Sequence, residues 1–212
     1  MYIPKHFEEQ RPEELYRVIR EYPLGILVLH GADGLDANHI PFELIEENGQ
    51  PVLLAHVARA NTLWQEAKNG DEALVIFRAA AAYISPNWYP SKQEFHRQVP
   101  TWNYQAVHVH GKINIRDDEK FVRAVVARLT RTHETRSGQE RPWKMTDSAK
   151  EYINQMVTAI VGIEIKIEKM VGKWRLSQNK DARDRATAAS ELQKRGDTIT
   201  AAAMLATLDG EG

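Results

Sequence analysis

The sequence of 212 residues contains no cysteine. This absence excludes disulfide bonds, a thiolate nucleophile and a cysteine metal site. Its 28 lysine and arginine residues almost balance its 29 acidic residues, so the formal net charge is −1. This charge gives no overall electrostatic attraction to nucleic acid or to a membrane surface, although local basic patches are still possible. No apolar run approaches the length of a membrane span, and the first ten residues lack a signal-peptide core. We therefore expect a cytoplasmic protein without a membrane partner.

Familiar catalytic motifs are also missing, since the sequence has no P-loop, no GxGxxG and no Ser–His–Asp order. His108 and His110 project from the same face of a predicted strand. Together with Glu134, which stands beside His133, they could be proposed as metal ligands. No third ligand has a diagnostic spacing, so a polar strand face, or one histidine that hydrogen-bonds a ligand, is favoured over a metal. We predict no catalytic residue and no metal site.

The remaining pattern predicts an α+β protein whose strands form a closed or nearly closed antiparallel barrel. Apolar runs indicate strands over residues 24–30, 35–45, 51–57, 73–77, 105–115 and 160–170, with 80–85 extending or following the fourth strand. Asn48–Gly49 is a hairpin signal. Helices are expected from Pro12 to Pro23, after Asn61, from Asp117 or Asp118 to about His133, after Asp147 or Ser148, and twice after Asp181 with a break at Gly196–Asp197.

Residues 83–104, YISPNWYPSKQEFHRQVPTWNY, combine tryptophans and tyrosines with three prolines. Because each proline removes a strand hydrogen-bond donor and fixes φ, this stretch is predicted to be an ordered loop between two strands. Long loops in compact domains are usually functional or disordered, and aromatic residues argue against disorder. A loop whose tryptophans only cap the core is the alternative.

Two short stretches could hold an anion. Arg59 and Asn61, in HVARAN, stand where a strand meets a helix start, and arginine donors with a helix N-terminus suit a phosphate. The alternative is an exposed arginine followed by an ordinary helix cap. The polar run Ser177–Lys180 could hold a phosphate or a polar ring edge, or it could be an ordinary turn.

The last two predicted helices loosely suggest a helix-turn-helix. The second, Ile199–Leu208, has no Arg, Lys, Asn or Gln and is therefore a poor reader of DNA bases. The first carries Arg183, Arg185, Lys194 and Arg195, which could contact phosphates or form a solvated face.

Several stretches taken together resemble one family. They are MYIPKHF, AHVARAN with Trp64, AYISPNWYPSK, VPTWNYQAVHVHG, IVGIEIKIEKMVGKWRLSQN and the pair Asp184–Arg185. The sequence is similar, from Met1 to about Arg195, to the PaiB family of FMN-binding negative transcriptional regulators. It departs from the family pattern where Ala79–Ala80 replace a usual Gly-Pro pair. The resemblance implies a split β-barrel flavoprotein fold and a homodimer with FMN at the subunit interface. It also implies repression of sporulation and protease genes.

Carried over residue by residue, the resemblance implies three groups of FMN contacts. Arg59 and Asn61 would meet the phosphate, and residues beside the flavin ring would be Thr101, Trp102 and Asn103. Contacts from near the C-terminal strand would come from Lys173, Ser177, Gln178 and Asn179. We expect a flavin-binding domain over residues 1–180 and a helical extension over 181–212, with DNA as a further candidate partner. The alternatives are a flavin- or haem-binding oxidoreductase on the same barrel and an interaction module with an empty cleft.

Overall fold

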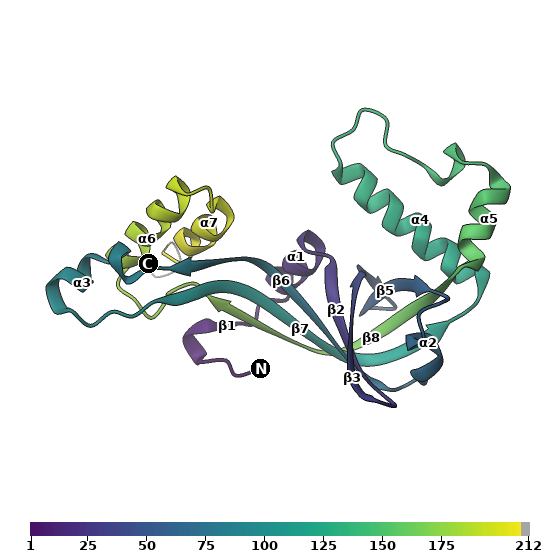
Figure 1. Ribbon diagram of the computed structural model, residues 1–212, viewed down its shortest axis with the longest axis horizontal. Helices are drawn as coiled ribbons and strands as arrows, with labels where there is room; N and C mark the ends of the chain where they lie inside the picture. The colour runs from purple at the N-terminus through teal and green to yellow at the C-terminus, as the bar shows by residue number, and fades with distance from the viewer. Residues whose placement is uncertain (209–212) are drawn as a thin grey trace. The chain divides into compact units, whose positions relative to one another are not determined.

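The computed structural model describes residues 1–208, which form two compact units. The first unit comprises Met1–Val18, Arg78–Val107 and the described residues from Val171 onward. The second comprises Ile19–Phe77 and His108–Met170. Three long strands, β6 (Glu72–Ile84), β7 (Thr101–Arg116) and β8 (Ile160–Arg175), contribute residues to both units (Figure 1). The units are therefore not successive stretches of sequence, and a domain boundary at residue 180 stays a prediction.

The second unit contains the barrel. Its remaining strands are β2 (Leu24–Gly31), β3 (Gly34–Pro41), β4 (Glu43–Glu47) and β5 (Gln50–Ala58). The strand order is β3-β2-β6-β7-β8-β5-β4, with antiparallel pairing of β2 to β3 and β6, and of β5 to β4 and β8. The two ends of this order, β3 and β4, are separated in sequence only by the buried Phe42. A sheet whose ends are joined by one residue must curl, which confirms the predicted barrel.

Local sequence explains the hairpins and one close approach. Asn48 and Gly49 both have positive φ, 51° and 76°, as a tight two-residue turn between β4 and β5 requires. At Gly111 in β7, a Cβ atom would lie 2.2 Å from the carbonyl oxygen of Lys166 in β8. Only glycine leaves room for β8 to approach β7 at this point.

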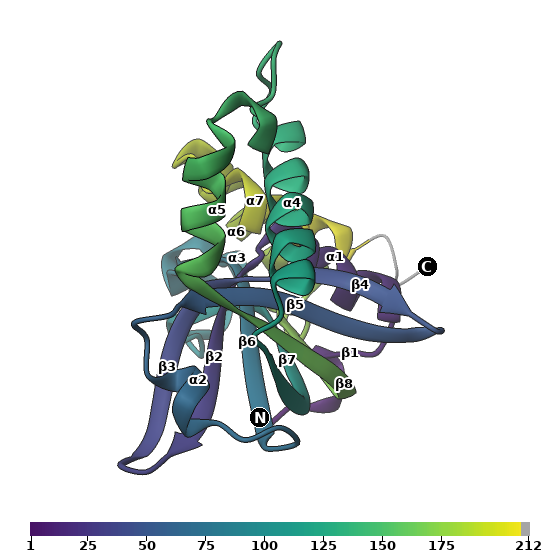
Figure 2. The ribbon, with the colours of Figure 1, turned by 90° about the vertical axis from the view of Figure 1, so that its right-hand side faces the viewer.

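Two helices of the second unit lie side by side (Figure 2). Helix α4 (Glu119–Arg136) begins where Asp118 accepts a hydrogen bond from the Phe121 amide, as predicted. Its buried face packs on β5 through the core residues Val52, Leu54, Val125 and Leu129. A loop containing a 3-10 turn (Met145–Asp147) leads to α5 (Lys150–Thr158). The predicted cap of α5 by Asp147 or Ser148 is wrong, because Ala149 holds the N-cap position.

The first unit carries the remaining helices. Near its start are a 3-10 turn (Lys5–Phe7), the short strand β1 (Glu8–Glu9) and α1 (Pro12–Glu21), whose last residues belong to the second unit. Near its end, α6 (Ala182–Lys194) packs against α7 (Thr198–Ala206), with the predicted break between them (Figure 1). Alanine-rich faces make this close packing possible, since Ala188, Ala189 and Ala201 are fully buried.

Several predicted boundaries were wrong. Residues 83–104 are not one loop, because β6 runs to Ile84, β7 starts at Thr101, and between them lie a 3-10 turn (Pro86–Trp88) and α3 (Pro90–Phe95). Pro86 and Pro90 start these two helices, where a proline loses no hydrogen bond.

Two further strands differ from prediction, and the fourth strand is extended, as one of its two predicted alternatives states. Strand β8 continues past Met170 to Arg175, pairing with β1 at Gly172, where a side chain would crowd the carbonyl of Glu9. The predicted strand 35–45 divides at Phe42, and β6 continues through Ala79–Ala80 without interruption.

In the second unit, α2 (Leu63–Glu66) is shorter than predicted. No helix among residues 1–208 is both long enough and apolar enough to cross a membrane.

Candidate functional site

The predicted ligand residues fall into both units. Arg59 and Asn61 belong to the second unit, and the other seven belong to the first. Those seven are Thr101, Trp102 and Asn103 in β7, Lys173 in β8, and Ser177, Gln178 and Asn179 in the segment that follows β8.

In the second unit, the Arg59 guanidinium is already bound by protein groups. Both terminal nitrogens donate to the carboxylate of Asp117, and Nε donates to the carbonyl of Thr158 at 2.9 Å. The hydrogen bonds and charge of Asp117 raise the pKa of Arg59, and the hydrogen bonds and charge of Arg59 lower the pKa of Asp117. Trp64 packs 5.5 Å from the guanidinium and donates its ring N–H to the Arg59 carbonyl. A phosphate could use this arginine only after displacing Asp117.

The side chain of Asn61 is also engaged. Its Oδ1 accepts a hydrogen bond from the Leu63 amide at 2.9 Å, and its Nδ2 donates to Asn38 at 2.8 Å. The first interaction is an Asx-turn just before α2, which has Thr62 as its N-cap and contains only four residues. Such a short helix supplies little dipole for an anion. The geometry therefore favours a structural role for Asn61.

In the first unit, two predicted residues meet in the interior. Asn103 is fully buried and donates to the Ser177 hydroxyl at 2.9 Å, and Tyr89 lies 3.2 Å from the same hydroxyl. Burial raises the pKa of Tyr89, so this phenol is neutral at physiological pH. Ser177 has a φ of 65°, which is rare for a residue that is not glycine. Strained backbone of this kind is often found at functional sites.

A cavity of about 110 Å³ opens beside this contact. Its polar lining consists of Thr101, Asn103, Arg175, Ser177, Asn179 and Lys180, and its apolar lining of Phe7, Val99 and Pro100. Four of the nine predicted ligand residues are thus brought together at one cavity. Asparagine, serine and threonine side chains supply hydrogen-bond donors there, and Arg175 and Lys180 supply positive charge.

The two cations of this cavity have only neutral partners. Arg175 donates to the carbonyl of Trp102 and lies 5.7 Å from the Phe7 ring centre. Lys180 donates to the side-chain oxygen of Gln98. Within residues 1–208, neither forms an ion pair with a carboxylate. The cavity therefore carries positive charge that the described chain does not neutralise.

The remaining predicted residues lie elsewhere in the first unit. Trp102 is 56% exposed and packs edge-to-face against Tyr83, with ring centres 6.0 Å apart. Lys173 donates to the Tyr2 carbonyl at 3.0 Å and lies 5.8 Å from the Tyr104 ring centre. Gln178 is used internally, because its amide bonds the backbone of Trp174 and Leu176. An aromatic surface is thus available for a planar ring, and Gln178 has a local structural role.

The nine ligand residues that the sequence predicts include neither Arg175 nor Lys180. Lys180 belongs to the polar run after β8, and Arg175 stands two residues beyond Lys173. Because alternate residues of a strand share a face, recognising that β8 extends to Arg175 would have placed Arg175 on the same face as Lys173 and directly before the polar run that contains Lys180. The predicted end of the strand at Met170 hid this signal.

Basic residues of α6 are engaged within the chain. Arg183 pairs with Glu94 at 2.8 Å, and Lys194 pairs with Glu191 at 2.7 Å. Arg195 lies 5.0 Å from the Trp88 ring centre. Arg185 is only 2% exposed and donates to Thr207. Helix α6 therefore offers little unpaired positive charge to a DNA backbone.

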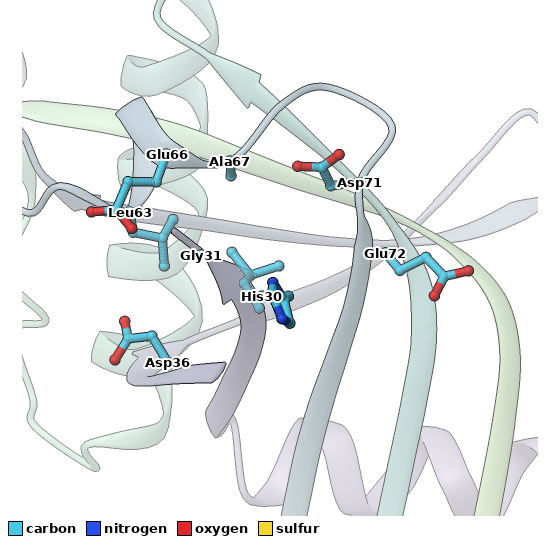
Figure 3. A pocket seen from close by; sticks show the side chains of 9 residues that line it. His30, Gly31, Asp36, Leu63, Glu66, Ala67, Asp71 and Glu72 are labelled. Atoms are coloured by element: carbon cyan, nitrogen blue, oxygen red, sulfur yellow. The ribbon is translucent and has the colours of Figure 1, made fainter. Parts of the chain in front are cut away.

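Another pocket, of about 230 Å³, lies in the second unit (Figure 3). Its lining includes His30 and the carboxylates of Asp36, Glu66, Asp71 and Glu72. Negative charge of this density repels a phosphate, so this pocket does not suit a flavin nucleotide. Among residues 1–208, no group of three or more histidine, aspartate or glutamate side chains is arranged to hold a metal ion.

Comparison with known proteins decides the family. The family described as "Putative FMN-binding domain" matches residues 1–169. Over 193 residues the chain is 28% identical to protease synthase and sporulation protein PAI 2 of Bacillus subtilis, covering 91% of this chain and 89% of that protein. The chain belongs to this family. The predicted assignment to the PaiB family is therefore confirmed, and it places the chain among flavin-binding proteins.

Two solved structures confirm the predicted fold class. The FAD and heme binding protein from Mycobacterium smegmatis has a TM-score of 0.58 and 16% identity, covering 82% of this chain and 76% of that one. The flavocytochrome Anf3 from Azotobacter vinelandii has a TM-score of 0.58 and 12% identity, covering 87% and 78%. At such identities the likeness concerns the fold alone, an α+β split barrel with peripheral helices.

The residues of the first unit fit a flavin in chemical kind. A flavin nucleotide needs cations and hydrogen-bond donors for phosphate and flat apolar walls for its ring. Arg175, Lys180, Ser177 and the exposed Trp102 supply these groups. Ligand pockets usually exceed about 300 Å³, so the cavity of about 110 Å³ can enclose only part of such a molecule.

Proposed function

We propose that the protein binds FMN as a homodimer and acts in gene regulation as a member of the PaiB family. The observation that carries the FMN proposal is the cavity of the first unit, which is lined by two cations without carboxylate partners among the described residues. Family membership supports the same ligand.

The proposed ligand contacts use most of the predicted residues. Thr101, Asn103, Ser177 and Asn179 offer polar groups at the cavity. Trp102 offers an exposed aromatic face. Lys173 lies on β8, two residues before the cavity residue Arg175. Arg59 and Asn61 remain predicted phosphate contacts. Arg59 could bind a phosphate only if its ion pair with Asp117 were broken.

A second copy of the chain is proposed because a single cavity is too small for FMN. The part of the ligand outside the cavity would stay in water unless another surface covered it. Exposed aromatic side chains of the first unit, namely Tyr2 (82%), Trp102 (56%) and Tyr83 (46%), are available to such a surface. Aromatic residues are enriched at protein interfaces, which supports this choice.

The regulatory part of the proposal follows the Bacillus relative, whose name refers to protease synthesis and sporulation. The charges of α6 argue against direct contact with DNA through this helix, because Arg183 and Lys194 are paired with acidic residues. We propose that regulation acts through ligand binding, with DNA contacted by another surface or by a partner protein.

A second candidate is a flavin- or haem-binding oxidoreductase. One observation favours it: burial lowers the pKa of His108. A neutral imidazole is the form that binds haem iron. The name of the M. smegmatis neighbour includes both FAD and heme, which fits the same barrel supporting either role.

Purified protein tests these proposals in one series of measurements. We expect flavin absorbance, release of FMN on denaturation, and a dimer by light scattering. Absence of any bound flavin, together with no binding of added FMN, would refute the cofactor proposal. A Soret band or flavin-dependent oxidation of NAD(P)H would favour the oxidoreductase. Gel shifts across a salt series test DNA binding, because non-specific binding falls steeply with salt.

A further inference from the structure

Two cations line one small cavity in the first unit. One stands at the end of β8 and the other in the segment that follows it. Arg175 is the last residue of β8, and Lys180 follows five residues later, just before α6. Both side chains are half-buried, and both line the cavity of about 110 Å³. Like charges brought together in a partly desolvated space repel each other more strongly than they would in water. An anion in this cavity would be attracted by both cations.

The described chain does not supply a compensating carboxylate. The nearest acidic group in the hydrogen-bond network is Asp184, and Gln98 separates it from Lys180. Gln98 accepts from Lys180 with its oxygen and donates with its nitrogen toward Ser91 and Asp184. Asp184 itself accepts from the amide and hydroxyl of Ser91. The carboxylate of Asp184 is therefore bound to Ser91 of α3 and does not pair with Lys180. The side chain of Lys180 lines the cavity.

The rest of the polar lining is suited to an oxyanion. No acidic side chain lines this cavity in the described chain, whereas Thr101, Asn103, Ser177 and Asn179 carry hydroxyl or amide groups. Ser177 is held there with a φ of 65° by its bonds to Tyr89 and Asn103. The volume is sufficient for a single phosphate or carboxylate group and too small for a whole nucleotide.

We propose that Arg175 and Lys180 form an anion-binding pocket for the phosphate or carboxylate group of a small-molecule ligand. Neither residue belongs to the predicted flavin contacts. Two sources of the anion share this chemistry. One is the phosphate of the flavin nucleotide, and this part rests on the proposed function. The other is a separate small oxyanion, which would leave the flavin phosphate to Arg59.

The test compares FMN, riboflavin and inorganic phosphate on the full chain. The variants are Lys180→Met and Arg175→Gln. Lys194→Met is the matched control, because Lys194 is exposed and paired with Glu191 on α6. Calorimetry measures phosphate binding at constant ionic strength, and flavin fluorescence measures FMN and riboflavin. Loss of one hydrogen bond to a charged group corresponds to roughly a tenfold to hundredfold loss of affinity.

Each outcome has one interpretation. A loss of FMN affinity in both variants, with riboflavin binding and the control unchanged, places the flavin phosphate in the pocket. A loss of inorganic phosphate binding with FMN affinity unchanged identifies a separate anion. If the wild-type protein binds phosphate but no flavin, and both variants lose phosphate binding, the proposed function is refuted and the anion-binding pocket stands.

Unchanged affinity for both FMN and phosphate in both variants overturns the proposal. Folding is checked by thermal melting, and Lys180→Arg, which keeps the charge, should retain most of the binding. If neither variant folds, the wild-type protein decides: an absence of phosphate binding by calorimetry, together with equal affinities for FMN and riboflavin, would also overturn it.

Discussion

Replacing Asp184 by alanine should destabilise the first unit, because this carboxylate joins α6 to α3 from a buried position. Asp184 is 1% exposed and accepts hydrogen bonds from the Ser91 amide at 3.1 Å and from the Ser91 hydroxyl. Hydrogen bonds to charged groups contribute about 1.5–3 kcal/mol each. Removal of a buried charge also removes its desolvation cost, which offsets part of the loss. We expect a net loss of about 2–4 kcal/mol in the free energy of unfolding.

The assay is urea unfolding of Asp184→Ala, Ser91→Ala and the double variant. Ser91→Ala removes the hydroxyl that donates to Asp184 and accepts from Gln98, and it should cost about 1.5–3 kcal/mol. Because the two residues are in contact, the double variant should lose less than the sum, with a coupling of at least about 0.5 kcal/mol. Asp181→Ala is the control, since Asp181 is exposed and its side chain makes no capping bond. A loss below about 0.5 kcal/mol for Asp184→Ala would refute this reasoning.

Three further predictions concern the second unit. Gly111→Ala should destabilise the protein by about 1–3 kcal/mol, because the new Cβ would lie 2.2 Å from the carbonyl oxygen of Lys166, and thermal melting measures the loss. His56 is half-buried, its Nδ1 atom is buried without a hydrogen-bond partner among the described residues, and burial lowers its pKa. The unfolded chain then binds this proton more tightly than the folded one, so stability should fall as pH drops below about 6.5, and His56→Gln should flatten this dependence in unfolding measured between pH 8 and pH 5. Asp117→Ala removes the carboxylate bound to Arg59, so FMN affinity should rise if this arginine takes the phosphate, whereas unchanged affinity in a flavin titration would leave Arg59 with a structural role alone.

Elements defined by local pattern were predictable from the sequence. Helix α1 follows from Pro12 and the helical spacing after it, and the β4–β5 hairpin follows from Asn48–Gly49. Such features depend on a few adjacent residues, so no long-range information is needed. The barrel followed from the number of strands and turns between them.

Long-range contacts were not predictable in this way. The bond between Asn103 and Ser177 joins residues 74 positions apart, and nothing in either local sequence indicates it. The extension of β8 to Arg175 depends on pairing with β1, a strand of two residues. The resemblance identified the region around Ser177, but it could not distinguish a side chain facing a cavity from one, such as Gln178, that bonds its own backbone.

The charge arrangement of α6 bears on how a regulator of this kind could act. A helix that contacts DNA phosphates gains affinity by releasing counterions from the DNA, which requires cations that the protein does not already neutralise. Arg183 and Lys194 would each have to leave an acidic partner, and Arg195 would have to leave Trp88, before they could contribute. The cations at the cavity, Arg175 and Lys180, have no such competitor within residues 1–208. Because an anion gains most where no carboxylate must be displaced, the first unit is better suited to bind a small charged ligand than a nucleic acid backbone. The regulatory role proposed above would then depend on occupancy of the cavity.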